Sequence, residues 1–163
     1  MKKVILSALL FVPFAAMNTA SAGDVTCRST LGAISTDDNV YVPSGATCTL
    51  NGTRVDGTVK VESGGTLIMQ SARINGNVQA DKFRSVTING GSIGGSIQLK
   101  EGGNVSIQGV RVNGDIQLEK NRGMVRVFSN VVGGNLQCKE NSPAPTGSGN
   151  RVDGNKEDQC RNF

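Results

Sequence analysis

The chain has 163 residues, of which 37% are hydrophobic, 18% charged and only 4% aromatic, and its formal net charge is +4. It contains no histidine, which excludes Ser-His or Cys-His nucleophile pairs and His-based metal sites. A charge this small does not predict a nucleic-acid-binding protein. Composition therefore argues against these functions and does not indicate a particular one.

The first 22 residues have the pattern of a secretory signal peptide. Lys2 and Lys3 form a basic start, Val4 to Ala16 is an apolar run, and Ala20-Ser21-Ala22 is a small-residue cleavage site. The alternative, a membrane anchor, would need about 20 apolar residues. We therefore expect a mature chain from Gly23, exported to the periplasm or the extracellular space, with no integral membrane segment and a net charge lowered from +4 to +2.

Residues 23–38 show no periodicity and are predicted to form an N-terminal cap. Residues 39–154 are an internal repeat, because six glycines stand 19, 19, 19, 20 and 20 residues apart. A fixed period near twenty residues indicates one supersecondary unit stacked on copies of itself. The glycines are Gly57, Gly76, Gly95, Gly114, Gly134 and Gly154.

Five positions of the repeat are apolar in each of the first five units. In the first unit they are Val40, Val42, Cys48, Leu50 and Val55. The first two are two residues apart, as are the next two, which is the period of a strand and not of a helix. The repeat therefore predicts an all-β, single-domain parallel β-helix of about six coils, with three short strands in each coil. A right-handed sense is expected because parallel crossovers are right-handed in nearly all proteins.

Towards the C-terminus, the inward positions of the repeat are no longer occupied by apolar residues. Residues 142–150 are rich in Pro, Gly and Ser and are predicted to form a loop, and Lys156 and Asp158 fall at inward positions of a further coil. Residues 155–163 are therefore predicted to form a C-terminal cap or tail.

Four cysteines in an exported chain predict disulfides, with three possible pairings. In a solenoid, Cys48 and Cys138 would lie five coils apart, about 24 Å at the spacing of neighbouring strands, which is too far for a disulfide. Cys27 and Cys48 are about one coil apart, as are Cys138 and Cys160. We therefore predict the pairs Cys27 with Cys48 and Cys138 with Cys160.

The coil length and the recurring Val-x-Gly-x-Val/Ile-x-Val/Leu pattern, as in residues 55–61, resemble the bactofilin domain over residues 39–134. The resemblance implies a bacterial polymer-forming β-helix. Bactofilins are cytosolic and polymerise through uncapped apolar ends, whereas this chain has a signal peptide and a cysteine pair at each end. The tail, residues 138–147 and 154–160, is similar to the endings of uncharacterised exported bacterial proteins, a resemblance that implies no activity.

Two outward-facing columns of the repeat are the candidate binding residues. The third position is mostly amide, and stacked glutamines predict either a structural hydrogen-bonded ladder or a strip that meets sugar hydroxyls. The sixteenth position is mostly arginine. This predicts either a solvated face or a row of guanidinium groups that bind carboxylate or phosphate. The candidates are Gln79, Gln98, Gln117, Gln137, Arg54, Arg73, Arg111 and Arg151.

Within the arginine column, two members have an acidic residue two positions later. Arg54 precedes Asp56 and Arg151 precedes Asp153, which predicts surface ion pairs of little energetic value. Arg73 and Arg111 have only Asn at that position. These two arginines are therefore the best candidates for binding an anion.

We expect no enzyme, no catalytic residue, no metal and no cofactor, because the short connections build no walled cleft. The sequence favours a non-enzymatic binding module for an extended envelope or extracellular polysaccharide. The alternative is a structural or self-associating rod of the cell envelope. The chain is expected to be a monomer, with end-to-end association as the alternative, and to have no nucleic-acid partner.

Overall fold

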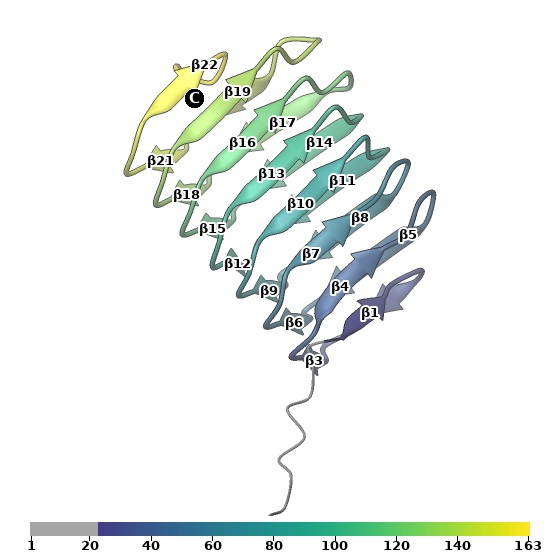
Figure 1. The fold of residues 1–163 in the computed structure, drawn as a ribbon. Helices are drawn as coiled ribbons and strands as arrows, with labels where there is room; N and C mark the ends of the chain where they lie inside the picture. The colour runs from purple at the N-terminus through teal and green to yellow at the C-terminus, as the bar shows by residue number, and fades with distance from the viewer. Residues whose placement is uncertain (1–22) are drawn as a thin grey trace, which may run out of the picture.

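Hydrogen bonds between backbone segments one repeat apart wind the chain into a three-sided tube (Figure 1). This computed structural model describes residues 23–163, so the predicted signal peptide lies outside the described residues. Each coil contributes one strand to each of three parallel sheets, here called sheets A, B and C. The prediction of a single-domain, all-β parallel helix is confirmed; its right-handed sense stays a prediction.

Sheet A is the longest and has eight strands. They are β1 (Asp24–Thr26), β4 (Asn39–Val42), β7 (Val59–Val61), β10 (Val78–Asp81), β13 (Ile97–Lys100), β16 (Ile116–Glu119), β19 (Leu136–Lys139) and β22 (Lys156–Asp158). Sheet B has seven, namely β2 (Thr30–Leu31), β5 (Thr47–Asn51), β8 (Thr66–Gln70), β11 (Ser85–Asn89), β14 (Asn104–Gln108), β17 (Val125–Phe128) and β20 (Thr146–Ser148).

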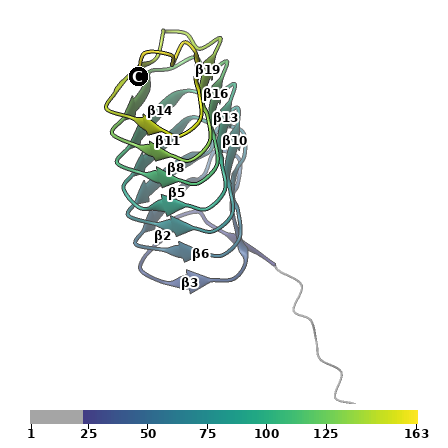
Figure 2. The same ribbon diagram turned by 90° about the vertical axis from the view of Figure 1, so that its left-hand side faces the viewer.

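Sheet C consists of seven strands of two residues each. They are β3 (Ser35–Thr36), β6 (Arg54–Val55), β9 (Arg73–Ile74), β12 (Ser92–Ile93), β15 (Arg111–Val112), β18 (Val131–Val132) and β21 (Arg151–Val152). Figure 2 shows the coils of the chain stacked one above another along the rod.

Neighbouring coils are in register, so that equivalent residues of the repeat stack. Val59, Val78 and Ile97 lie opposite one another in sheet A, and Met69, Ile88 and Ile107 do so in sheet B. All five apolar positions of the first five repeats are buried in the core, as the alternation predicted. The β-branched side chains suit a narrow tube because they pack well on a pleated surface.

The expected N-terminal cap proves to be a further coil. Residues 24–36 form β1, β2 and β3, which pair with β4, β5 and β6. Val25 lies opposite Val40, 15 positions later, but Leu31 lies opposite Leu50, 19 positions later. The repeat is therefore shortened between sheets A and B, which hides its period in the sequence and raises the number of coils from six to seven.

The C-terminal end is closed by its own last residues. β20 runs through the segment that was expected to be a loop and pairs with β17, and β22 pairs with β19. Phe163 packs against the core and covers Gly147, where a Cβ would overlap the ring. Lys156 is half-buried, and its ammonium donates to the carbonyl oxygen of Phe163.

Both predicted disulfides are present. The Cα atoms are 5.4 Å apart in Cys27–Cys48 and 5.2 Å apart in Cys138–Cys160, within the usual range for a disulfide. Each bond joins neighbouring coils near one end of the rod. Two disulfides in a chain of this size indicate an oxidising compartment, the periplasm or the extracellular space.

Asparagine ladders inside two corners of the tube were not predicted. Asn130 accepts the N–H of Val110 at 3.0 Å and donates to the carbonyl of Ile107 at 3.0 Å and to Asn150 Oδ1 at 2.9 Å. Asn121 and Asn141 repeat this arrangement at the corner between sheets A and B. These amides satisfy buried backbone groups that the strands leave unpaired.

A third polar column follows the corner between sheets C and A. Its side-chain oxygens each accept the backbone N–H of the equivalent residue one coil later. The members are Asn39, Thr58, Asn77, Ser96, Asp115 and Asn135. In the described residues, no buried side-chain nitrogen or oxygen lacks a partner.

The alternation of inward and outward residues predicts opposite effects of an acidic residue at adjacent positions of β11. Ile88→Asp should prevent folding, because a carboxylate in the dry core has no partner. Asn89→Asp, next to it and exposed, should change the free energy of unfolding by no more than about 0.5 kcal/mol. Thermal unfolding followed by circular dichroism measures both. Equal stability of the two variants would contradict the assigned register.

The corner ladder predicts that Asn130 matters for stability although it is polar. Asn130→Ala should cost about 3 kcal/mol, because an unsatisfied buried hydrogen-bonding group costs about 1–3 kcal/mol and the change leaves more than one. Asn113→Ala, at an exposed position, is the control and should be near neutral. Urea unfolding of both variants tests this, and a loss for Asn130→Ala no larger than for the control would show that the ladder is dispensable.

Candidate functional site

The two candidate columns lie on different faces of the rod. Gln79, Gln98, Gln117 and Gln137 stand opposite one another on the outer face of sheet A. The arginine column follows sheet C in the order Arg54, Arg73, Ser92, Arg111, Val131 and Arg151. The structure therefore aligns each column but separates the two.

The glutamines of sheet A form a hydrogen-bonded ladder. Gln79 Nε2 donates to Gln98 Oε1 at 3.1 Å, and Gln98 Nε2 donates to Gln117 Oε1 at 3.2 Å. Gln137 donates instead to Glu157 of β22, at 3.1 Å. The prediction of a structural hydrogen-bonded ladder is confirmed for Gln79, Gln98 and Gln117. A primary amide has two N–H donors and two acceptor lone pairs, so amides held in this way keep capacity for a ligand.

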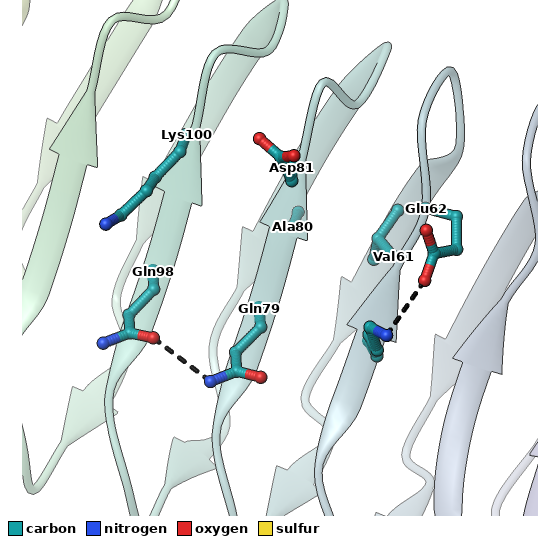
Figure 3. A pocket seen from close by; sticks show the side chains of 8 residues that line it. Val61, Glu62, Gln79, Ala80, Asp81, Gln98 and Lys100 are labelled. Carbon is teal, nitrogen blue, oxygen red and sulfur yellow. Dashed lines mark hydrogen bonds and ion pairs between the residues drawn. The ribbon is translucent and has the colours of Figure 1, made fainter.

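A shallow hollow of about 290 Å³ lies over this ladder (Figure 3). Gln79 and Gln98 form one part of its wall, and Figure 3 shows their amides joined by a hydrogen bond. Charged side chains of both signs complete it. The lining residues are Lys60, Val61, Glu62, Gln79, Ala80, Asp81, Gln98 and Lys100.

A second hollow of about 350 Å³ adjoins the first towards the N-terminal end. The two share Lys60 and Gln79. The second is lined also by Tyr41, which is half-buried and stands opposite Lys60 in the register. The residues that line the two hollows lie along sheet A, from β1 to β13, and we call the two hollows together the sheet A groove.

The Lys60–Glu62 ion pair shapes the middle of this groove. Lys60 occupies the same column as the glutamines, but its Nζ lies 3.1 Å from Glu62 Oε1 and makes no bond to Gln79. The hydrogen bond and the charge of Glu62 raise the pKa of Lys60 above its usual value of 10.5. The ammonium is therefore fully charged at neutral pH and is drawn away from the ladder.

The rim of the groove carries further exposed ion pairs. Lys82 lies 3.9 Å from both Asp81 and Glu101, and Lys100 lies 3.6 Å from Glu119. Exposed pairs of this kind contribute little to stability. Their side chains can therefore turn to a ligand at small cost.

On sheet C, two of the arginines form ion pairs and two do not, as the sequence predicted. Arg54 Nη2 lies 3.1 Å from Asp56 Oδ1, and Arg151 Nε lies 3.6 Å from Asp153 Oδ1. Among residues 23–163, no carboxylate lies within 4.0 Å of the guanidinium of Arg73 or Arg111. In the described part of the chain, these two exposed arginines therefore make no ion pair.

Sequence reasoning missed Tyr41, Lys60 and the carboxylates as parts of one site. Tyr41 and Lys60 share the column of the glutamines, and this shared position was the available signal. The hollow combines residues of this column with Glu62, Asp81 and Lys100, which stand at other positions of the repeat.

In the described part of the chain, no three Cys, Asp or Glu side chains gather as metal ligands would. Over the same residues, no helix has the length and apolar character to cross a bilayer.

The ion pair at the centre of the groove predicts a measurable change in proton affinity. Glu62→Gln should lower the pKa of Lys60, because a neutral amide no longer stabilises the ammonium. NMR titration of the Lys60 side chain measures this. Glu101→Gln, which removes a partner of Lys82 instead, is the control and should leave Lys60 unchanged. An unaltered Lys60 pKa in Glu62→Gln would mean that the ion pair is absent in solution.

No protein-family model matches the chain, and comparisons with curated proteins and with solved structures find no similar protein. The chain is a parallel β-solenoid with two disulfides.

Proposed function

We propose that this protein is an exported, non-enzymatic β-solenoid that binds an extended polysaccharide of the cell envelope or the extracellular space. The observation that carries the proposal is the sheet A groove, where two adjoining hollows share Lys60 and Gln79 beside the glutamine ladder. The other candidate column faces away from this groove, on sheet C.

The chemistry of the groove suits sugar hydroxyl groups. A hydroxyl both donates and accepts hydrogen bonds, as a primary amide does. Gln79 and Gln98 are held by each other, so a ligand would not have to order them on binding. Tyr41 offers a ring with an apolar face and a polar tip. Lys60, Lys100 and Asp81 supply charges for substituents of either sign.

The shape of the groove suits a polymer. From Tyr41 to Gln98 the column crosses three coil steps, about 14 Å along the rod, which is long enough for a short run of sugar rings. The groove is open and follows the rod axis, so a long chain could enter and leave at both ends. The parallel sheet that carries it keeps the spacing of the amides fixed.

A second candidate function is a structural rod that associates end to end, as the resemblance to polymer-forming bactofilin domains implies. The N-terminal coil favours this role, because Ile34 is 49% exposed there and β1, β2 and β3 are the edge strands of their sheets. Exposed strand edges can pair with another chain. Sedimentation at several concentrations separates the two roles, since a series of oligomers would favour the rod and a monomer the binding module.

Binding to a glycan array by the disulfide-bonded protein tests the groove. The variant Gln79→Ala with Gln98→Ala should bind its glycan about tenfold more weakly, since hydrogen bonds to the ligand are lost. The matched control is Gln70→Ala with Gln108→Ala, which removes two exposed glutamines from sheet B. Equal affinity of both double variants, or no glycan bound by the parent protein, would overturn the proposal.

A further inference from the structure

Sheet C places two arginines on either side of a small residue. Arg73 of β9 and Arg111 of β15 both stand opposite Ser92 of β12. The two arginines are therefore two strand spacings apart, about 10 Å between their backbones. Long flexible side chains at this separation can bring both guanidinium groups over the residue between them.

The space between the arginines is free of bulky side chains. Ser92 is half-buried, and within the described residues its hydroxyl has no hydrogen-bond partner in the protein. Gly94 lies two residues further along the same coil. A Cβ at Gly94 would overlap the carbonyl oxygen of Asn75, so only glycine fits this corner. Between the two arginines the column therefore carries only the short side chain of Ser92.

The charges around Ser92 favour an anion. The carboxylate of Asp56, one coil away from Arg73, is already held by Arg54 at 3.1 Å and by Asn75 Nδ2 at 2.6 Å. Asn113, beside Arg111, is an exposed neutral amide. The like charges of Arg73 and Arg111, two coils apart, repel each other unless an anion lies between them, and this column supplies none.

We propose that Arg73, Ser92 and Arg111 form a clamp for one oxyanion of an acidic glycan, a uronate carboxylate or a sulfate or phosphate ester. Each guanidinium fork can donate two parallel hydrogen bonds to such a group, and the Ser92 hydroxyl donates one from below. The clamp extends the proposed binding of glycans, but it lies on a different face from the sheet A groove. Either site can therefore fail without the other.

The test is an NMR titration of the ¹⁵N-labelled, disulfide-bonded protein with tetragalacturonate, and in parallel with its methyl ester, which has no charge. The acidic ligand should shift the amide signals of residues 92–94, with an affinity that falls as salt is added. Arg73→Ala, Arg111→Ala and Ser92→Glu should each weaken binding about tenfold, because charge-assisted hydrogen bonds are lost or are satisfied by the new internal carboxylate.

The matched control is Arg54→Ala, which removes an arginine of the same column that is already paired with Asp56. It should change the affinity by no more than about twofold. All of these positions are outside the core, so melting temperatures should agree and separate binding from folding. The clamp is overturned if Arg54→Ala weakens binding as much as Arg73→Ala, if the methyl ester binds as well as the acid, or if neither ligand shifts residues 92–94.

Discussion

The pairing of each coil with the next is the interaction on which the whole molecule depends. A single coil has three strands of two to five residues and cannot bury its apolar side chains alone. In-register parallel pairing gives every strand hydrogen-bond partners on neighbouring coils and stacks the apolar positions into one continuous core. The two ends are the exceptions, and there Cys27–Cys48, Cys138–Cys160 and Phe163 hold the last coils in place.

The same stacking that builds the core also builds the polar columns. When a residue type recurs at one position of the repeat, its copies lie one strand spacing apart, and amides at that distance hydrogen-bond to each other. Gln79 and Gln98 do so on the surface, and Asn130 and Asn150 do so in a corner. Arginines in a column cannot hydrogen-bond to each other. Arg54 and Arg151 form ion pairs with carboxylates two residues later in the chain. Arg73 and Arg111 have no carboxylate at that position.

A rod built in this way presents different chemistry on each face at fixed spacings. Sheet A offers hydrogen-bonded amides beside a groove with charges of both signs, and sheet C offers two arginines on either side of a serine. Rigid, linear arrays lose little freedom when an extended ligand binds along them. This property, and not an enclosed cavity, is what the fold contributes to a binding function.

The parallel β-helix, the inward positions and the disulfide partners could be predicted from the sequence, because all three follow from a local pattern repeated at a constant interval. The folded structure was needed to show that residues 24–36 form a coil, since the shortened corner before Leu31 breaks that interval. It also decided that Asn130 is buried, because an asparagine in a turn looks the same in sequence whether it faces solvent or the corner of a tube. The sheet A groove likewise joins residues that are far apart in the sequence, from Tyr41 to Lys100. The column of Tyr41, Lys60, Gln79 and Gln98 comes from four successive coils, and its members lie side by side only when the chain has wound.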